Sequence, residues 1–129
     1  MHVLAFLKCL RWLNNSMINS LRHVVLDLLR GRYDCGDAMP LSKLAVLLYG
    51  YDSPHTEGKA KGLLRAVRLR MLWNHGLDIG TCYDENGEPR YYIIGDPATY
   101  ERLLRDYKEG RLTIEAPRSK KEKRLLYTI

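Results

Sequence analysis

Residues 41–94 constrain the fold of this 129-residue chain more than any other part of it. Mostly apolar residues follow Ser42, a candidate helix cap, as far as Gly50, where a residue without Cβ can take the left-handed conformation that ends a helix. Ser53 then provides a capping oxygen directly before a proline, the residue favoured at the first helical position, so a longer helix is predicted over Pro54–His75. We therefore expect two successive helices joined by a short polar turn.

A β hairpin is predicted directly after the second of these helices. Residues 77–83 and 90–94 are rich in β-branched and aromatic side chains, and they flank the turn signal Asn86-Gly87. Alternation along each strand places every second side chain on the same face of the hairpin. Residues 39–41 are expected to form a short edge strand beside it.

Two further helices are predicted before this segment. Residues 3–13 carry apolar side chains at helical spacing, but they form a helix of only about three turns, which must pack on another surface to be stable. The apolar repeat that begins at Met17 is the most regular in the chain. It is expected to belong to the core and to end at Gly31.

The last predicted helix opens with Asp96-Pro97 and closes at Gly110. Glu101 and Arg105 are four residues apart and are expected to pair on its surface. Its buried stripe is expected to consist of Tyr100, Leu103, Leu104 and Tyr107.

Composition narrows the classes of function. A net charge of +6 favours polyanionic partners. No spacing suggests a nucleophile paired with a histidine, and no glycine-rich phosphate loop follows a strand, so neither an enzyme nor a cofactor is expected. Cys9, Cys35 and Cys82 are widely separated in sequence, which indicates neither a disulfide framework nor a zinc site and fits a reducing, cytoplasmic setting. The apolar N-terminal stretch resembles neither a signal peptide nor a membrane span.

The segment from Leu41 to Ile94 resembles the winged helix-turn-helix superfamily. The resemblance rests on the helix LSKLAVLLYG, the longer basic helix after it, and the hairpin pattern GxxI...NG...YYII. It implies a mostly α fold with a small β hairpin, in which a winged helix-turn-helix core carries an additional N-terminal helix and a C-terminal helix. In that family the second helix of the pair enters the major groove of double-stranded DNA, and the hairpin touches the flanking backbone or minor groove.

The chain is expected to divide into three parts. Residues 1–14 are expected to form an amphipathic helix for packing or dimerisation, and residues 15–110 to form the winged-helix domain. Residues 111–129 form a basic tail. Because DNA readers often pair two half-sites, a homodimer joined through the N-terminal helix is expected.

The DNA-binding residues implied by the resemblance lie in the first turns of the long helix and in the hairpin. Lysine and arginine can neutralise phosphates or reach guanine edges, threonine can contact phosphate or a base, and glycine permits close approach of the backbone. A solvated helix face is the alternative interpretation. The implied residues are His55, Thr56, Lys59, Lys61, Gly62, Arg65 and Arg90.

Two features oppose DNA binding. Acidic residues surround the hairpin turn, so a phosphate backbone would meet net negative charge there. Leu69 and Trp73 fall roughly opposite the core stripe of the long helix, and they are either covered by another element or form an apolar patch for a protein partner. A protein-interaction module on a winged-helix scaffold that does not itself bind DNA is therefore the alternative function. RNA binding is a further one, and it requires exposed tyrosines.

Overall fold

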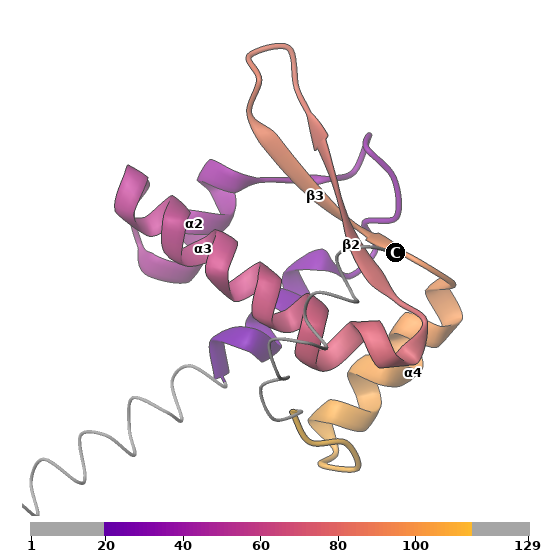
Figure 1. The fold of residues 1–129 in the computed structure, drawn as a ribbon. Helices are drawn as coiled ribbons and strands as arrows, with labels where there is room; N and C mark the ends of the chain where they lie inside the picture. The colour runs from indigo at the N-terminus through magenta and orange to yellow at the C-terminus, as the bar shows by residue number, and fades with distance from the viewer. Residues whose placement is uncertain (1–19, 115–129) are drawn as a thin grey trace, which may run out of the picture.

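The computed structural model of the chain describes residues 20–114. The predicted helix of residues 3–13, with its proposed role in dimerisation, and residues 115–129 of the basic tail lie outside the described residues. The described chain is mostly helical, with a small antiparallel sheet (Figure 1). After the helical residues 20–29, the elements are β1 (Met39–Pro40), α2 (Leu41–Tyr49), α3 (Pro54–Val67), a π-helical turn η1 (Arg68–Leu72), a 3-10 turn η2 (Trp73–His75), β2 (Asp78–Tyr83), β3 (Pro89–Ile94) and α4 (Pro97–Lys108).

This order gives a winged-helix-like layout and confirms the predicted fold class. Two helices, α2 and α3, are joined by a short turn and followed by the hairpin of β2 and β3. The sheet has the strand order β1-β3-β2, and the hairpin projects beyond the helices in Figure 1. The predicted edge strand is present as β1, which pairs with β3 through Met39 and Tyr91.

The long basic helix begins as the sequence predicts. Ser53 caps α3 by accepting a hydrogen bond from the Thr56 amide, while the Thr56 hydroxyl accepts one from the Ser53 amide. This reciprocal arrangement satisfies two backbone groups at the start of the helix. The helical path continues through η1 and η2 to His75 and ends at Gly76, which adopts φ +73°. The turn at η1 is a π-helix, a widening that the apolar spacing did not predict.

The start of α2 differs from the prediction. The helix begins at Leu41, and the Pro40 before it makes no capping hydrogen bond through its side chain. Ser42, predicted as the cap, lies inside the first turn, where its amide nitrogen donates to Glu88 Oε1 at 2.9 Å and its hydroxyl also bonds to that oxygen. A carboxylate of the hairpin therefore accepts the hydrogen bond that a local cap would have accepted.

The hairpin has the predicted strands in a regular register. Ile79 pairs with Ile93 and Thr81 with Tyr91, so these four side chains share one face of the sheet. Gly87 takes φ +78° at the turn. The chain reverses there because the Gly87 amide donates to the Asp84 carbonyl at 3.0 Å.

The core lies between the helices and the sheet. The predicted stripe of α4 is confirmed, and the hydroxyl of Tyr107 donates to the carbonyl of Met71 at 2.9 Å. The prediction that Glu101 pairs with Arg105 is wrong. Glu101 Oε1 instead accepts a hydrogen bond from Arg30 Nε at 2.8 Å. That contact ties α4 to the end of the helical residues 20–29, a neighbour that local spacing within α4 cannot reveal.

Candidate nucleic-acid interface

The exposed face of α3 carries a strip of glycine between basic side chains. Gly58 and Gly62 lie one helical turn apart and are both exposed. At about 100° per residue, they fall between Lys61 on one side of the helix and Lys59 on the other. We call the face formed by Gly58, Lys59, Lys61, Gly62 and Arg65 the glycine window.

Nothing in the described chain explains the two glycines. A Cβ added at Gly58 or Gly62 would meet no atom within 4 Å, and neither residue has a left-handed backbone. Glycine inside a helix costs about 1 kcal/mol relative to alanine. The glycine window is therefore open, and it lowers helix stability without serving the packing of the described residues.

Lysines extend from the two sides of this window. Lys59 reaches toward α2, where its Nζ lies 5.4 Å from the centre of the Tyr49 ring. Lys61 lies on the side of the hairpin and lines a hollow there. His55, in the first turn of α3, is exposed near the same end of the window. The helix thus presents positive charge on both sides of a surface that has no side chains at its centre.

Thr56 does not belong to this surface. It is 1% exposed, and its hydroxyl is occupied by the capping arrangement with Ser53 and by a hydrogen bond to the Tyr51 carbonyl at 3.0 Å. The expectation that it faces a groove of DNA is corrected for this reason. The sequence held the signal, because a hydroxyl residue three positions after the cap suits the reciprocal capping arrangement.

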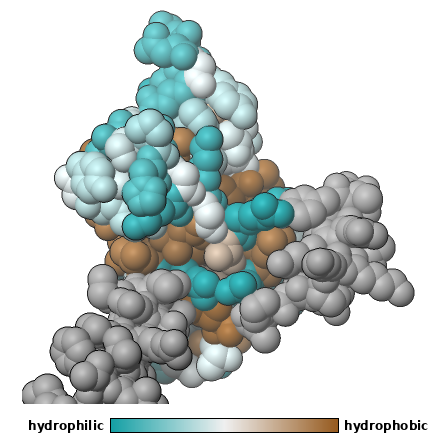
Figure 2. Space-filling model, turned by 60° about the vertical axis from the view of Figure 1, so that its left-hand side comes forward, coloured by the Kyte–Doolittle hydropathy of each residue, from teal (hydrophilic) through white to brown (hydrophobic). Residues whose placement is uncertain are grey.

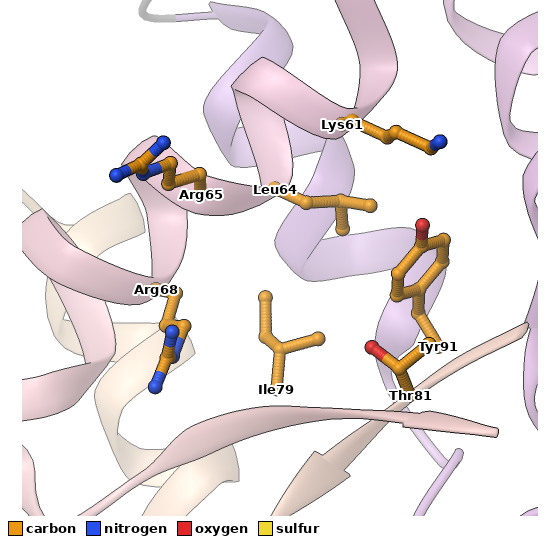
Figure 3. Close-up of a pocket in the computed structure, with 7 residues that line it drawn as sticks. All are labelled: Lys61, Leu64, Arg65, Arg68, Ile79, Thr81 and Tyr91. Carbon is orange, nitrogen blue, oxygen red and sulfur yellow. The ribbon is translucent and has the colours of Figure 1, made fainter. Parts of the chain in front are cut away.

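A hollow of about 340 Å³ separates α3 from the hairpin (Figure 3). Side chains of α3 and its extension face side chains of β2 and β3 across it, and Leu64 and Ile79 are its apolar lining residues from the two sides. Arg68 is held by two contacts with the carboxylate of Asp78. The complete lining consists of Lys61, Leu64, Arg65, Arg68, Ile79, Thr81 and Tyr91.

The sequence did not place Thr81 and Tyr91 in this site. Strand alternation assigned each to a face of its strand, but it could not say that α3 faces them. Tyr91 is 8% exposed, and its burial raises the pKa of its phenol. Its hydroxyl end points toward Lys61 in Figure 3. The hollow therefore combines exposed cations with hydroxyl groups, which suits an anionic group.

We call the hairpin of β2 and β3 the wing, and most of the acidic residues around its turn are engaged within the chain. The Asp84 carboxylate accepts the amides of Asn86 and Glu88, each at 2.9 Å, and these backbone hydrogen bonds lower its pKa. Glu88 bonds to Ser42 as described above. Figure 2 shows that the projecting tip of the molecule is hydrophilic. These carboxylates thus build the turn and hold the first turn of α2. They keep their negative charge, and Glu88 also acts on Glu57 at the start of α3. The acidic hairpin turn therefore continues to oppose a phosphate backbone close to it.

Arg90 is not brought together with the basic residues of α3. It neighbours Tyr91 on β3, so its side chain belongs to the opposite face of the sheet. There its Nη2 lies 3.6 Å from Asp84 Oδ2. A contact between Arg90 and the partner of the glycine window would require that partner to wrap around the hairpin.

Glu57 is an acidic neighbour that the sequence pattern did not reveal. Desolvation, and after it the nearby Asp52, raise the pKa of its carboxyl, while Lys61 opposes them. Glu57 lies one position before Gly58 in the first turn of α3. Its charge weakens the positive potential at that end of the glycine window.

The exposed apolar side chains do not lie where the sequence predicted an apolar patch. Leu69 is 8% exposed, so the first of the two alternatives, that it is covered, holds for it. Trp73 is half-buried, with the Arg68 guanidinium 5.5 Å from its ring centre. Exposed apolar side chains lie instead on and after α2, where Val46 and Leu47 are about half exposed.

Among residues 20–114, no group of three or more histidine, cysteine or acidic side chains is placed to hold a metal ion. The helices within that range are all too short or too polar to cross a bilayer. Comparison with known proteins gave no further guide. No protein-family model, no curated protein and no solved structure matched the chain.

Proposed function

We propose that the chain is a winged-helix protein that binds double-stranded DNA by inserting α3 into the major groove. The glycine window carries this proposal. An α-helix fits the major groove, and glycine lets its backbone approach the base edges. Two exposed glycines that no internal packing requires are explained by a partner that packs against them.

The basic side chains support the same partner. Lys59 and Lys61 lie on opposite sides of the window, so each is suited to one of the two phosphate backbones that border a groove. Arg65, one turn after Lys61, extends the positive charge along the helix. A small cytoplasmic regulator of transcription, replication or recombination is the role we propose for such a domain. Dimerisation through residues 1–14 would allow it to bind paired half-sites.

The double substitution Lys59→Ala/Arg65→Ala tests the interface. We expect the affinity for duplex DNA of random sequence to fall about 10- to 100-fold. The slope of log affinity against log salt should flatten by about 0.9 for each phosphate that the variant no longer neutralises. Fluorescence anisotropy at several salt concentrations measures both quantities.

Arg102→Ala/Arg105→Ala is the matched control, because it removes two exposed cations from α4 and leaves α3 intact. It should change affinity much less than the α3 variant. Equal losses from the two variants would mean that net charge, and not the glycine window, determines binding. A wild-type protein that does not bind duplex DNA at low salt would refute the proposal.

A protein-interaction module is the second candidate function. Val46, Leu47 and Tyr51 are 46%, 48% and 56% exposed, and they lie close together in sequence at the end of α2. A scaffold of this kind would give no retardation of random duplex DNA at low salt. DNA retardation that added salt weakens would favour the first candidate.

A further inference from the structure

Two cysteines that are distant in sequence line one hollow on the other side of the hairpin. Cys35 lies in the loop of residues 30–38, and Cys82 lies on β2. A second hollow of about 530 Å³ is lined by both of them and by the residues of the hairpin turn. Neither cysteine is in a disulfide.

The side chains of Cys35 and Cys82 lie within hydrogen-bonding reach of each other on this hollow. A hydrogen bond between the Cys35 and Cys82 side chains is the largest of the effects that raise the pKa of Cys82. Arg90 pairs with Cys82 across the sheet, and its positive charge opposes this effect by lowering the pKa of Cys82 and stabilising the thiolate. A hydrogen-bonded pair of thiols requires only a small movement to reach the length of a disulfide.

The loop that carries Cys35 is fixed on both sides of the cysteine. The Arg32 carbonyl accepts the Ile93 amide at 2.8 Å, and the Arg32 guanidinium donates to the Asp37 carbonyl at 2.7 Å. The Asp37 amide in turn donates to Asp34 Oδ1 at 3.0 Å. These contacts hold Cys35 beside the sheet, so its proximity to Cys82 is a property of the fold.

Access to the two thiols differs. Cys35 is exposed, whereas Cys82 is partly covered. An external oxidant therefore reaches Cys35 first, and Cys82 is positioned to attack the product. This division of roles is the one that redox-responsive cysteine pairs require.

From this geometry we propose that Cys35 and Cys82 form a reversible disulfide that joins the loop of residues 30–38 to the wing, with low-molecular-weight disulfides such as glutathione disulfide as the oxidant. The Cys35 thiolate attacks one sulfur of glutathione disulfide, forms a mixed disulfide and releases one glutathione thiolate. Cys82 then loses its proton and attacks the Cys35 sulfur, releasing the second glutathione thiolate. Two protein thiols are oxidised, and one glutathione disulfide is reduced to two thiols. This disulfide does not depend on the proposed DNA binding.

The disulfide would close a long segment of chain between β2 and a loop that precedes α2. Cross-links of this kind stabilise a protein mainly by restricting its unfolded state. We expect the Tm of the oxidised protein to exceed that of the reduced protein by on the order of 10 °C. Dithiothreitol should reverse the difference.

The test uses the full chain and a Cys9→Ser variant, which keeps only the two cysteines of interest. Both proteins are equilibrated with glutathione and glutathione disulfide at increasing oxidising ratios, treated with a maleimide, and digested with trypsin. We expect mass spectrometry to find residues 33–43 joined to residues 71–90, with neither cysteine available to the maleimide. Cys9→Ser/Cys82→Ser is the control, and it should carry only a mixed disulfide with glutathione at Cys35.

Three results would overturn the inference. Cys35 and Cys82 could both stay reactive toward maleimide, or could each carry glutathione, under conditions that oxidise an ordinary dithiol. Disulfides could instead form only between two molecules, as a non-reducing gel of the Cys9→Ser variant would show.

Discussion

Helices α3 and α4 begin in the same way and differ on the faces that they expose. Each has a capping side chain followed by proline, Ser53 and Asp96 being the caps, and each buries one apolar stripe in the shared core. On α4, Glu101 pairs with Arg30 and Lys108 pairs with Asp27, both at 2.8 Å. On α3 the exposed face has two glycines with open space above them. The exposed side chains of α4 thus make ion pairs within the chain, whereas the glycines of α3 leave part of its exposed face without side chains.

The largest expected effect tests whether the two helices share one core equally. Leu64 in α3 and Leu104 in α4 are 5% and 4% exposed. Replacing either with alanine should lower the free energy of unfolding by about 2–5 kcal/mol, because both changes leave a cavity. Urea unfolding measures the two variants side by side. A decrease below about 1 kcal/mol for Leu104→Ala alone would make α4 an attachment and not part of the core.

A smaller effect on the free energy of unfolding is expected from removing the glycines of α3 and introducing glycines on the exposed face of α4. Gly58→Ala/Gly62→Ala should raise the free energy of unfolding by about 1–2 kcal/mol, because no atom obstructs the added methyl groups. Arg102→Gly/Arg105→Gly should lower it by a similar amount, because α4 then carries the same cost. Thermal unfolding of the two variants checks that one change raises the free energy of unfolding and the other lowers it.

The glycine variants also separate stability from binding. Gly62→Leu should keep the stability of the fold but weaken binding to duplex DNA by roughly tenfold or more, since its side chain would hold the helix away from the base edges. Gly62→Ala serves as the control for a minimal side chain. Unchanged affinity of Gly62→Leu would remove the glycine window from the interface, whatever its effect on stability.

The smallest expected effect concerns the acidic residue beside the window. The raised pKa of Glu57 means that the folded state binds its proton more tightly than the unfolded state does. Stability from this group is therefore lost as pH rises from the ordinary carboxyl pKa through the raised one, and Glu57→Gln should remove that dependence. At neutral pH the same variant should bind DNA about threefold more tightly, because it repels phosphates less.

Glu101→Gln on α4 is the matched control for Glu57→Gln, and it should leave affinity nearly unchanged. The ratio of the Glu57→Gln affinity to that of the wild type should fall toward one as pH drops through the Glu57 pKa. A ratio that does not depend on pH would show that the Glu57 charge is remote from the bound DNA.

Local signals predicted the helices and the hairpin because the groups that fix them are neighbours in sequence. Ser53 and Pro54 start α3, and the spacing of Tyr100 to Tyr107 defines the buried stripe of α4. Gly87 takes the left-handed turn position that the Asn-Gly pair predicts. In each case a few adjacent residues contain the whole physical cause.

The remaining features depend on residues far apart in the chain. The capping of α2 by Glu88 spans 46 positions, and the pairing of Arg30 with Glu101 spans 71. The burial of Leu69 accompanies a π-helical turn, whereas a periodicity of 3.6 assumes a regular helix throughout. The sequence predicted only the part of the candidate site that lies on α3. Its second wall, on the hairpin, required the fold.

The hydrogen bonds from Ser42 to Glu88 give the hairpin a mechanical role in the helix pair. The acceptor belongs to the turn end of the hairpin, directly before β3, and the donors belong to the first turn of α2. A wing that swings outward must therefore release that turn, since the apolar side chain of Pro40 cannot replace the missing acceptor. Wing opening and fraying of α2 become one event, and the exchange rate of the Ser42 amide proton reports how often it occurs.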